Sequence, residues 1–161
     1  MSDEGVTRRC FLRDAGLAGA CAALLPMLQA CETSEIDDDP LPEEIPFDTN
    51  AEPYSGLRAT GDIVGVESLN VLLVRDGRGE LLAFRRKCTH ADQDLADGTD
   101  TSGKWDDASR QLTCRLHLSV FSETGEVLKG AAMATLTRYR VEYNPETGSG
   151  IIFGRQLVNA A

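Results

Sequence analysis

The sequence predicts an all-β fold, either a small antiparallel β-sandwich or a partly open barrel. Short apolar runs rich in β-branched residues recur from residue 57 onward, and turn sequences separate them. No convincing helical pattern and no internal repeat interrupts this region. Many short strands of this kind are typical of sandwiches and small barrels. With 161 residues, the chain has room for one such domain and additional segments.

The predicted strands follow one another along the chain. The first two, at 62–67 and 69–74, lead into the hairpin turn Asp76-Gly77-Arg78-Gly79 and a returning strand at 80–86. A nucleotide-binding loop at these glycines is excluded, because no Lys-Ser/Thr pair and no helical pattern follow them. Further strands are expected around Trp105 and at 111–114, 119–121, 135–143 and 151–153, with turns at 123–126 and 144–148.

An acidic, proline-rich segment precedes these strands. Nine carboxylates, four prolines and no Lys or Arg lie between Glu32 and Pro53, whereas residues 54–161 carry 14 acidic and 13 basic residues. The formal net charge of −10 therefore belongs mainly to this segment. Its composition predicts an extended, disordered tether at 31–53, followed by the folded domain at 54–161. No basic stripe indicates a nucleic-acid partner.

The N-terminus resembles an export signal. Thr7-Arg8-Arg9-Cys10-Phe11-Leu12-Arg13 is similar to the twin-arginine pattern, and an uncharged stretch follows at 15–30. As a helix, those 16 residues would span about 24 Å, which is shorter than the ~30 Å hydrocarbon core of a membrane. The stretch is therefore typical of the apolar region of a signal peptide and not of a stable membrane span. The resemblance implies export of an already folded protein, directed by Arg8 and Arg9. A structural N-terminal helix with surface arginines is the alternative.

The uncharged stretch ends in Leu28-Gln29-Ala30-Cys31, which resembles a bacterial lipobox. The resemblance implies a signal peptide at 1–30, cleavage before Cys31 and lipidation of its thiol. The protein would then lie on the periplasmic side of a bacterial membrane, anchored by lipid. Two alternatives are an ordinary cleavage site, which would give a soluble periplasmic protein, and an uncleaved membrane anchor.

The chain has only two histidines, and each lies close to a cysteine. The pattern is Cys88-Thr89-His90, then 23 residues, then Cys114-Arg115-Leu116-His117. Two thiolates and two imidazoles suit zinc or an iron–sulfur cluster. Zinc fingers usually group like ligands in sequence, whereas a cluster with two Cys on one iron and two His on the other requires each loop to supply one of each. A zinc-stabilised β-domain with a binding role remains an alternative.

The two motifs resemble those of Rieske [2Fe–2S] proteins, and the resemblance extends over about residues 62–153. It implies a two-loop cluster-binding subdomain with one [2Fe–2S] cluster on Cys88, His90, Cys114 and His117. It also implies a one-electron carrier, not an enzyme by itself, whose partners are a cytochrome or an oxidoreductase. A small subunit of a larger oxidoreductase, similar to the arsenite oxidase Rieske subunit, is the alternative. A third histidine for an oxygenase iron is missing from the sequence.

Several positions depart from the family pattern. Gln93 and Leu116 stand where respiratory relatives carry two bridging cysteines, and Leu118 stands where relatives have glycine. The segment that covers the cluster in relatives is here Gly130-Ala131-Ala132-Met133, which contains no proline.

Two further positions bear on the reduction potential. In high-potential relatives a Ser and a Tyr hydrogen-bond the cluster sulfurs, and here Ser119 keeps the first hydroxyl while Phe121 lacks the second. Hydrogen bonds to sulfur stabilise the reduced cluster, so one bond of two predicts an intermediate potential. The alternative for Ser119 is an ordinary strand serine that bonds to the backbone.

Overall fold

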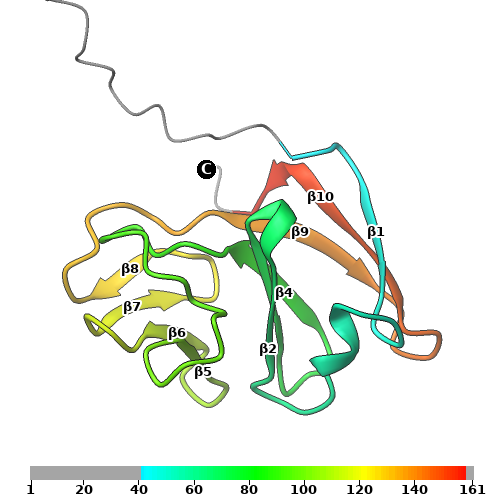
Figure 1. The fold of residues 1–161 in the computed structure, drawn as a ribbon, viewed down its shortest axis with the longest axis horizontal. Helices are drawn as coiled ribbons and strands as arrows, with labels where there is room; N and C mark the ends of the chain where they lie inside the picture. The colour runs from blue at the N-terminus through cyan, green and yellow to red at the C-terminus, as the bar shows by residue number, and fades with distance from the viewer. Residues whose placement is uncertain (1–40, 159–161) are drawn as a thin grey trace, which may run out of the picture. The chain divides into compact units, whose positions relative to one another are not determined.

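The computed structural model describes residues 41–158. Ten strands and two short 3₁₀ turns lie in the described range (Figure 1). In chain order they are β1 (Ile45–Asp48), η1 (Tyr54–Gly56), β2 (Ile63–Val66), η2 (Glu67–Leu69), β3 (Val71–Arg75), β4 (Leu81–Arg85), β5 (Gly103–Asp106), β6 (Gln111–Cys114), β7 (Ser119–Ser122), β8 (Val127–Lys129), β9 (Arg138–Tyr143) and β10 (Ser149–Leu157). The prediction of an all-β fold is confirmed.

The strands form two antiparallel sheets. The larger sheet has the order β1-β10-β9-β4-β3-β2, and the smaller sheet has the order β5-β6-β7-β8. The smaller sheet is an insertion between β4 and β9, which pair with each other through Ala83 with Tyr139 and Phe84 with Arg138. Figure 1 shows this inserted unit beside the larger sheet. The connections β4–β5 and β8–β9 therefore join the insertion to two paired strands of the larger sheet.

Two apolar cores lie on opposite faces of the larger sheet. Side chains of a strand alternate between faces. In β3, Val71 and Leu73 belong to one core, while Leu72 and Val74 belong to the other. All four side chains are fully buried, which explains why β3 reads as a continuous apolar run. The second of these cores also contains residues of the smaller sheet and holds the two sheets together.

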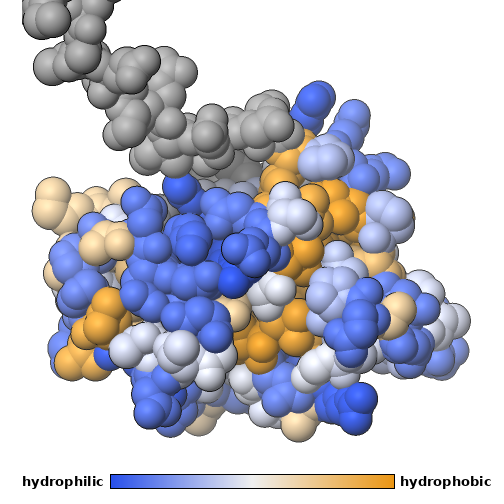
Figure 2. All heavy atoms as spheres, viewed as in Figure 1, coloured by the Kyte–Doolittle hydropathy of each residue, from blue (hydrophilic) through white to orange (hydrophobic). Residues whose placement is uncertain are grey.

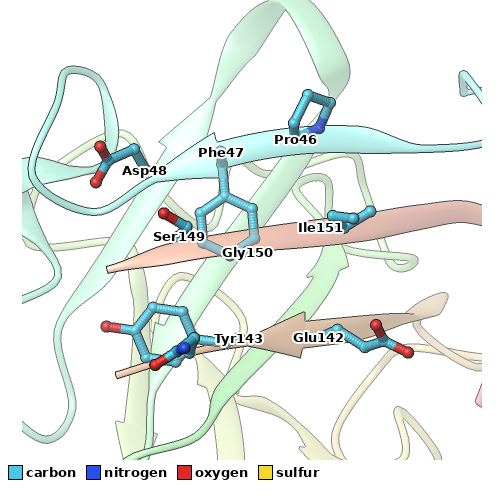
Figure 3. A pocket seen from close by; sticks show the side chains of 9 residues that line it. Pro46, Phe47, Asp48, Glu142, Tyr143, Ser149, Gly150 and Ile151 are labelled. Atoms are coloured by element: carbon cyan, nitrogen blue, oxygen red, sulfur yellow. The ribbon is translucent and has the colours of Figure 1, made fainter. Parts of the chain in front are cut away.

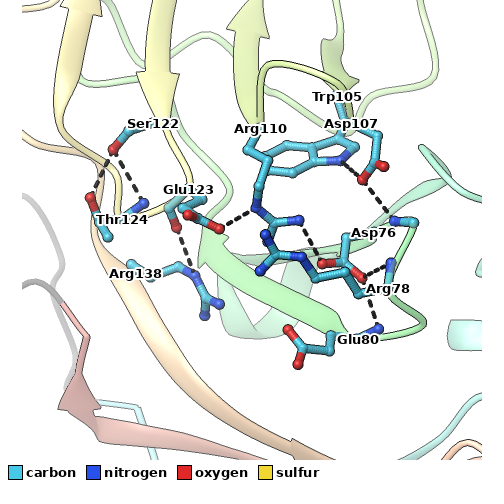
Figure 4. A network of polar contacts seen from close by, with 11 residues as sticks. Asp76, Arg78, Glu80, Trp105, Asp107, Arg110, Ser122, Glu123, Thr124 and Arg138 are labelled. Atoms are coloured by element: carbon cyan, nitrogen blue, oxygen red, sulfur yellow. Dashed lines mark hydrogen bonds and ion pairs between the residues drawn. The ribbon is translucent and has the colours of Figure 1, made fainter.

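A polar network adds a second connection between the sheets (Figure 4). Asp76, in the β3–β4 turn, accepts a 2.9 Å hydrogen bond from Arg110 in the β5–β6 turn. Arg110 also pairs with Glu123 and lies 5.7 Å from the ring centre of Trp105. Arg138 of β9 donates to the Glu123 carbonyl at 3.1 Å. Because Asp76 is almost fully buried, this network fixes the base of the smaller sheet.

The predicted tether at 31–53 is wrong in its C-terminal part. Residues 45–48 form β1, which pairs with β10 through Ile45 with Ile152 and Phe47 with Gly150. Ile45 and Phe47 are buried and alternate with exposed residues, so they supply the apolar face that a disordered tether would lack. The folded domain therefore begins before residue 45. Cys31, Arg8 and Arg9 lie outside the described residues.

Other boundaries differ by smaller amounts. β9 begins at Arg138, three residues after the predicted start, and β10 extends to Leu157, beyond the predicted 151–153. The short strand β8 was not predicted. Two of its three residues are exposed, so it lacks the alternation of buried and exposed side chains by which a strand is recognised. Within residues 41–158, no helix is long and apolar enough to cross a membrane.

Candidate metal centre

The first ligand loop follows β4 directly. The Cys88 N–H donates to the Gln93 carbonyl at 2.9 Å, and the Asp92 N–H donates back to the Cys88 carbonyl at 3.0 Å. Asp92 has φ of +49°, a left-handed conformation that Asp tolerates better than most residues. These contacts fold residues 88–93 into a tight turn, so that Cys88 and His90 come from one compact loop.

An ion pair closes the base of this loop. Two guanidinium nitrogens of Arg86 contact Asp94: Nη2 lies 2.7 Å from Oδ2, and Nε donates to Oδ1 at 2.8 Å. Lys87 Nζ lies 3.3 Å from Oδ2 of the same carboxylate. Partial burial alone would raise the pKa of Asp94. The hydrogen bonds from Arg86, the Ala96 N–H and Lys87, together with the charge of Arg86, outweigh this effect, and the pKa of Asp94 lies below its ordinary value. Two of the basic residues that precede Cys88, Arg86 and Lys87, are thus paired with Asp94 within the loop.

The second ligand loop is the tight β6–β7 connection. Cys114 and Ser119 form the last strand pair, and the Leu118 N–H donates to the Cys114 carbonyl at 2.9 Å. Leu118 has φ of +58°, where relatives of the resembled family have glycine. The loop therefore keeps its tight turn with a leucine, and it presents that side chain to solvent with 64% of its surface exposed.

The structure brings the four predicted ligands together in two like pairs. Cys88 and Cys114 are fully buried, and they are close enough to share a hydrogen bond. Burial raises the pKa of the Cys88 thiol to about 11, and the neighbouring Cys114 adds to the shift. His90 and His117 are exposed, with ring centres 4.6 Å apart and rings nearly perpendicular.

This arrangement fits a centre with two metal ions. Each loop supplies one cysteine and one histidine, yet across the loops sulfur meets sulfur and imidazole meets imidazole. Two thiolates can then hold one iron and two imidazoles the other, which is the ligand division of a mixed [2Fe–2S] cluster. Within residues 41–158, no group of three or more His, Cys, Asp or Glu side chains converges on a single metal position.

Ser119 is the strand partner of Cys114 across β6 and β7. Its side chain is fully buried, and its Oγ accepts a 3.0 Å hydrogen bond from the Ala132 N–H. A hydroxyl that accepts one bond still has its own proton to donate. Phe121 is also fully buried and belongs to the same core as both cysteines, but it has no polar atom to offer. The structure thus agrees with both interpretations of Ser119, as a backbone partner and as a donor toward sulfur.

The segment Gly130–Ala134 approaches both loops. Beside the Ala132 bond to Ser119, the Thr89 hydroxyl donates to the Ala134 carbonyl at 2.6 Å. A Cβ added at Gly130 would lie 2.5 Å from the Ser119 Cα. The sequence singled out the segment that begins at Gly130 as the counterpart of the one that covers the cluster in relatives, but it predicted neither a role for Thr89 nor the close approach of Gly130 to Ser119. The position of Thr89 between two candidate ligands was the one available signal.

The described surface also contains grooves away from the ligand loops. One of about 780 Å³ lies over β1, β10 and β9, where Phe47 and Tyr143 point into it beside Gly150 (Figure 3). None of its lining residues is a predicted ligand. In the view of Figure 2, apolar residues interrupt a mainly hydrophilic surface, with one group at the left edge on the side of the smaller sheet.

The fold and the paired ligands define a domain built around a binuclear centre, and comparison with known proteins gives its family. The model of the Rieske [2Fe-2S] domain family matches residues 49–140, more than half of the chain. The chain belongs to this family, carries one [2Fe–2S] cluster and is an iron–sulfur electron-transfer protein. The family assignment therefore favours the iron–sulfur cluster over a zinc-stabilised β-domain.

Two solved structures are similar to this chain. The plasma membrane Rieske protein PetC3 of the cyanobacterium Synechocystis PCC 6803 is 24% identical, with a TM-score of 0.41, over 57% of this chain and 84% of that one. The soluble domain of Rieske protein II (soxF) of Sulfolobus acidocaldarius is 21% identical, with a TM-score of 0.37, over 51% of this chain and 44% of that one. Comparison with curated protein sequences gives no match.

Proposed function

We propose that Cys88, His90, Cys114 and His117 hold the cluster and that the protein carries single electrons in a membrane-attached or periplasmic redox chain. The observation that carries this proposal is the grouping of two buried thiols and two exposed imidazoles from two loops. When bound, the cluster supplies a one-electron redox couple. The protein's own residues position it, exclude water from its sulfur side and leave the imidazole side open.

The exposed imidazoles mark the side on which a redox partner docks. Three large apolar side chains are exposed on the second ligand loop and on the segment that contacts both loops. Leu116 is 43% exposed, Leu118 64% and Met133 94%. Apolar side chains at the centre of an interface exclude water when the partner binds. We propose that a cytochrome or an oxidoreductase contacts this face.

Metal content and ligand variants test the assignment. The purified protein should contain about two irons and two acid-labile sulfides per chain and give a rhombic EPR signal when reduced. Cys114→Ser and His117→Ala should lose the cluster. Arg115→Gln, a change of an exposed side chain between the same two ligands, is the matched control and should retain it. Retention of a full cluster by either ligand variant would refute the ligand set.

Export and anchoring are proposed from the N-terminal motifs. The double change Arg8→Lys and Arg9→Lys should leave precursor in the cytoplasm, and Cys31→Ser should abolish lipidation and the matching cleavage. Because β1 begins at Ile45, the segment from Cys31 to the folded domain would reach about 45 Å if extended. Unchanged processing and detergent partitioning of Cys31→Ser would refute the lipid anchor alone.

The alternative, a small subunit of a larger oxidoreductase, is favoured by the same apolar side chains, since permanent interfaces are more apolar than transient ones. Purification from native membranes separates the two. A subunit should co-purify with a catalytic chain in fixed ratio, and a free carrier should not.

A further inference from the structure

A cluster held by two loops requires those loops to stay together, and this domain has no covalent bridge for the purpose. Cys88 and Cys114 are the cysteines of the described residues, both are free, and both are assigned to the cluster. Gln93 and Leu116 occupy the positions where respiratory relatives have bridging cysteines. Gln93 donates to the Asp94 carbonyl at 3.1 Å, within its own loop, while Leu116 is 43% exposed. Neither contact joins the two loops.

The segment Gly130–Ala134 contacts each loop through a different hydrogen bond. At one end, the Ala132 N–H donates to Ser119 Oγ, at the end of the second loop, over 3.0 Å in a buried environment. At the other end, Thr89 Oγ1 donates to the Ala134 carbonyl over 2.6 Å, and Thr89 lies between the two ligands of the first loop. The segment therefore connects the two loops through two hydrogen bonds, one between Ala132 and Ser119 and one between Thr89 and Ala134.

Close packing fixes this segment on the second loop. The Cβ-free face of Gly130 lies against the Leu118 carbonyl and the Ser119 backbone, where an added Cβ would be 2.5–2.8 Å from backbone atoms. Ala132 is buried in the same core as Cys88 and Cys114, so its methyl covers the thiol side. Met133, its neighbour, is 94% exposed and points the other way.

The small side chains of the segment leave its position dependent mainly on its hydrogen bonds. Residues 130–134 are Gly-Ala-Ala-Met-Ala, without a proline ring to fix any φ angle. Small side chains give little apolar anchoring beyond the single Ala132 methyl. The first loop meets the segment through the Thr89 hydroxyl, an exposed contact, whereas the second loop meets it through a buried one.

We infer that the segment Gly130–Ala134 is a non-covalent tie between the two ligand loops, and that Thr89 is the positioning residue that attaches the first loop to it. This inference rests on the proposed ligand set. Removing the Thr89 hydroxyl releases one end of the tie, and the loops then separate more often. Water and chelators reach the sulfur side of the cluster during those openings.

Three variants of the full-length holoprotein test the inference. Thr89→Val keeps the shape of the side chain and removes its hydroxyl, while Thr89→Ser keeps the hydroxyl and removes the methyl. Thr124→Val is the matched control, since Thr124 has a 2.8 Å hydroxyl contact with Ser122 in the β7–β8 turn, at the opposite end of the smaller sheet. Loss of visible absorbance with excess ferrous chelator, at fixed pH and temperature, reports cluster release.

We expect Thr89→Val to lose its cluster about three- to tenfold faster than the unsubstituted protein, because one hydrogen bond changes the opening equilibrium by about that factor. Thr89→Ser and Thr124→Val should match the unsubstituted protein. Equal rates for Thr89→Val and the unsubstituted protein would overturn the inference, and so would equally fast loss from Thr89→Val and Thr89→Ser.

A second measurement does not depend on how well a variant folds. In the unsubstituted protein, the Ala132 amide should exchange with deuterium slowly, as a buried hydrogen-bonded amide does. Rapid exchange of Ala132, comparable with that of exposed turn amides, would overturn the tie. An unsubstituted protein without iron would instead refute the proposed ligand set, so the two failures are distinguishable.

Discussion

Gly130 offers the sharpest test of how the segment packs on the second ligand loop. Its φ is +97°, and an added Cβ would lie 2.5 Å from the Ser119 Cα, 2.6 Å from the Leu118 oxygen and 2.8 Å from the Ser119 nitrogen. These neighbours are backbone atoms, which cannot rotate away as the end of a flexible side chain can. Gly130→Ala therefore forces either the segment or the loop to move.

Gly79 supplies a matched control. It has φ of +82°, and an added Cβ would meet nothing within 4 Å. A positive φ costs alanine about 1–2 kcal/mol, offset by about 0.4–1 kcal/mol from the smaller entropy of the unfolded chain. Gly79→Ala should therefore cost about 0.5–1.5 kcal/mol. Gly130→Ala adds steric overlap, typically about 1–3 kcal/mol, for a total of about 2–4 kcal/mol.

Thermal unfolding of the holoprotein, followed by far-UV circular dichroism, measures the difference. For a domain of this size, 1 kcal/mol corresponds to a change in Tm of about 4 °C. Gly130→Ala should lower Tm by roughly 8–16 °C and Gly79→Ala by roughly 2–6 °C. Equal decreases would show that only the backbone angle matters at Gly130 and that the close approach to Ser119 is not present in solution.

Three other predictions concern single side chains. On the interpretation of Ser119 as a donor toward sulfur, Ser119→Ala removes a hydrogen bond to the reduced cluster worth about 1.5–3 kcal/mol, so protein-film voltammetry at fixed pH should show the potential lower by roughly 60–130 mV. No change with the cluster intact would leave Ser119 as a strand serine. Asp76→Asn breaks the buried pair with Arg110, which should lower the free energy of unfolding by about 3 kcal/mol in denaturant titrations. Hydrogen bonds from Ser102 and then Thr99 lower the pKa of Asp97 to about 2, so its stabilisation is full above pH about 4 and is lost as the pH falls toward 2. The Tm of the unsubstituted protein should therefore fall more steeply over that interval than the Tm of Asp97→Asn, and parallel curves would contradict this.

The ligand pattern could be predicted because it depends on residue chemistry that is local in sequence. One residue separates Cys88 from His90 and two separate Cys114 from His117, so each motif lies within a few positions of the sequence. The alternation of β3 between two cores also follows from a short run of apolar residues. Even so, the burial of the cysteines and the exposure of the histidines required the fold, because both motifs contain one of each.

Three of the features that were missed, β1, the role of Thr89 and the need for glycine at 130, depend on partners outside their local sequence. β1 is stabilised by pairing with β10, about a hundred residues later, while its own composition is that of the acidic segment around it. Thr89 finds its acceptor 45 residues away, at Ala134. The need for glycine at 130 arises from the backbone of Ser119, which nothing in the local sequence of Gly130 indicates.

The opposite placement of the two ligand types separates two properties of the protein. On the core side, where Ser119 and Ala132 lie and water is excluded, burial disfavours the free thiolate of Cys88, so the proposed cluster iron would supply the compensating positive charge. The imidazoles are exposed to water, and Leu116 and Leu118, which flank His117 in the sequence, are also exposed and available to a partner. Changes on the core side should therefore shift the potential and leave docking intact, whereas changes on the exposed side should alter docking at constant potential.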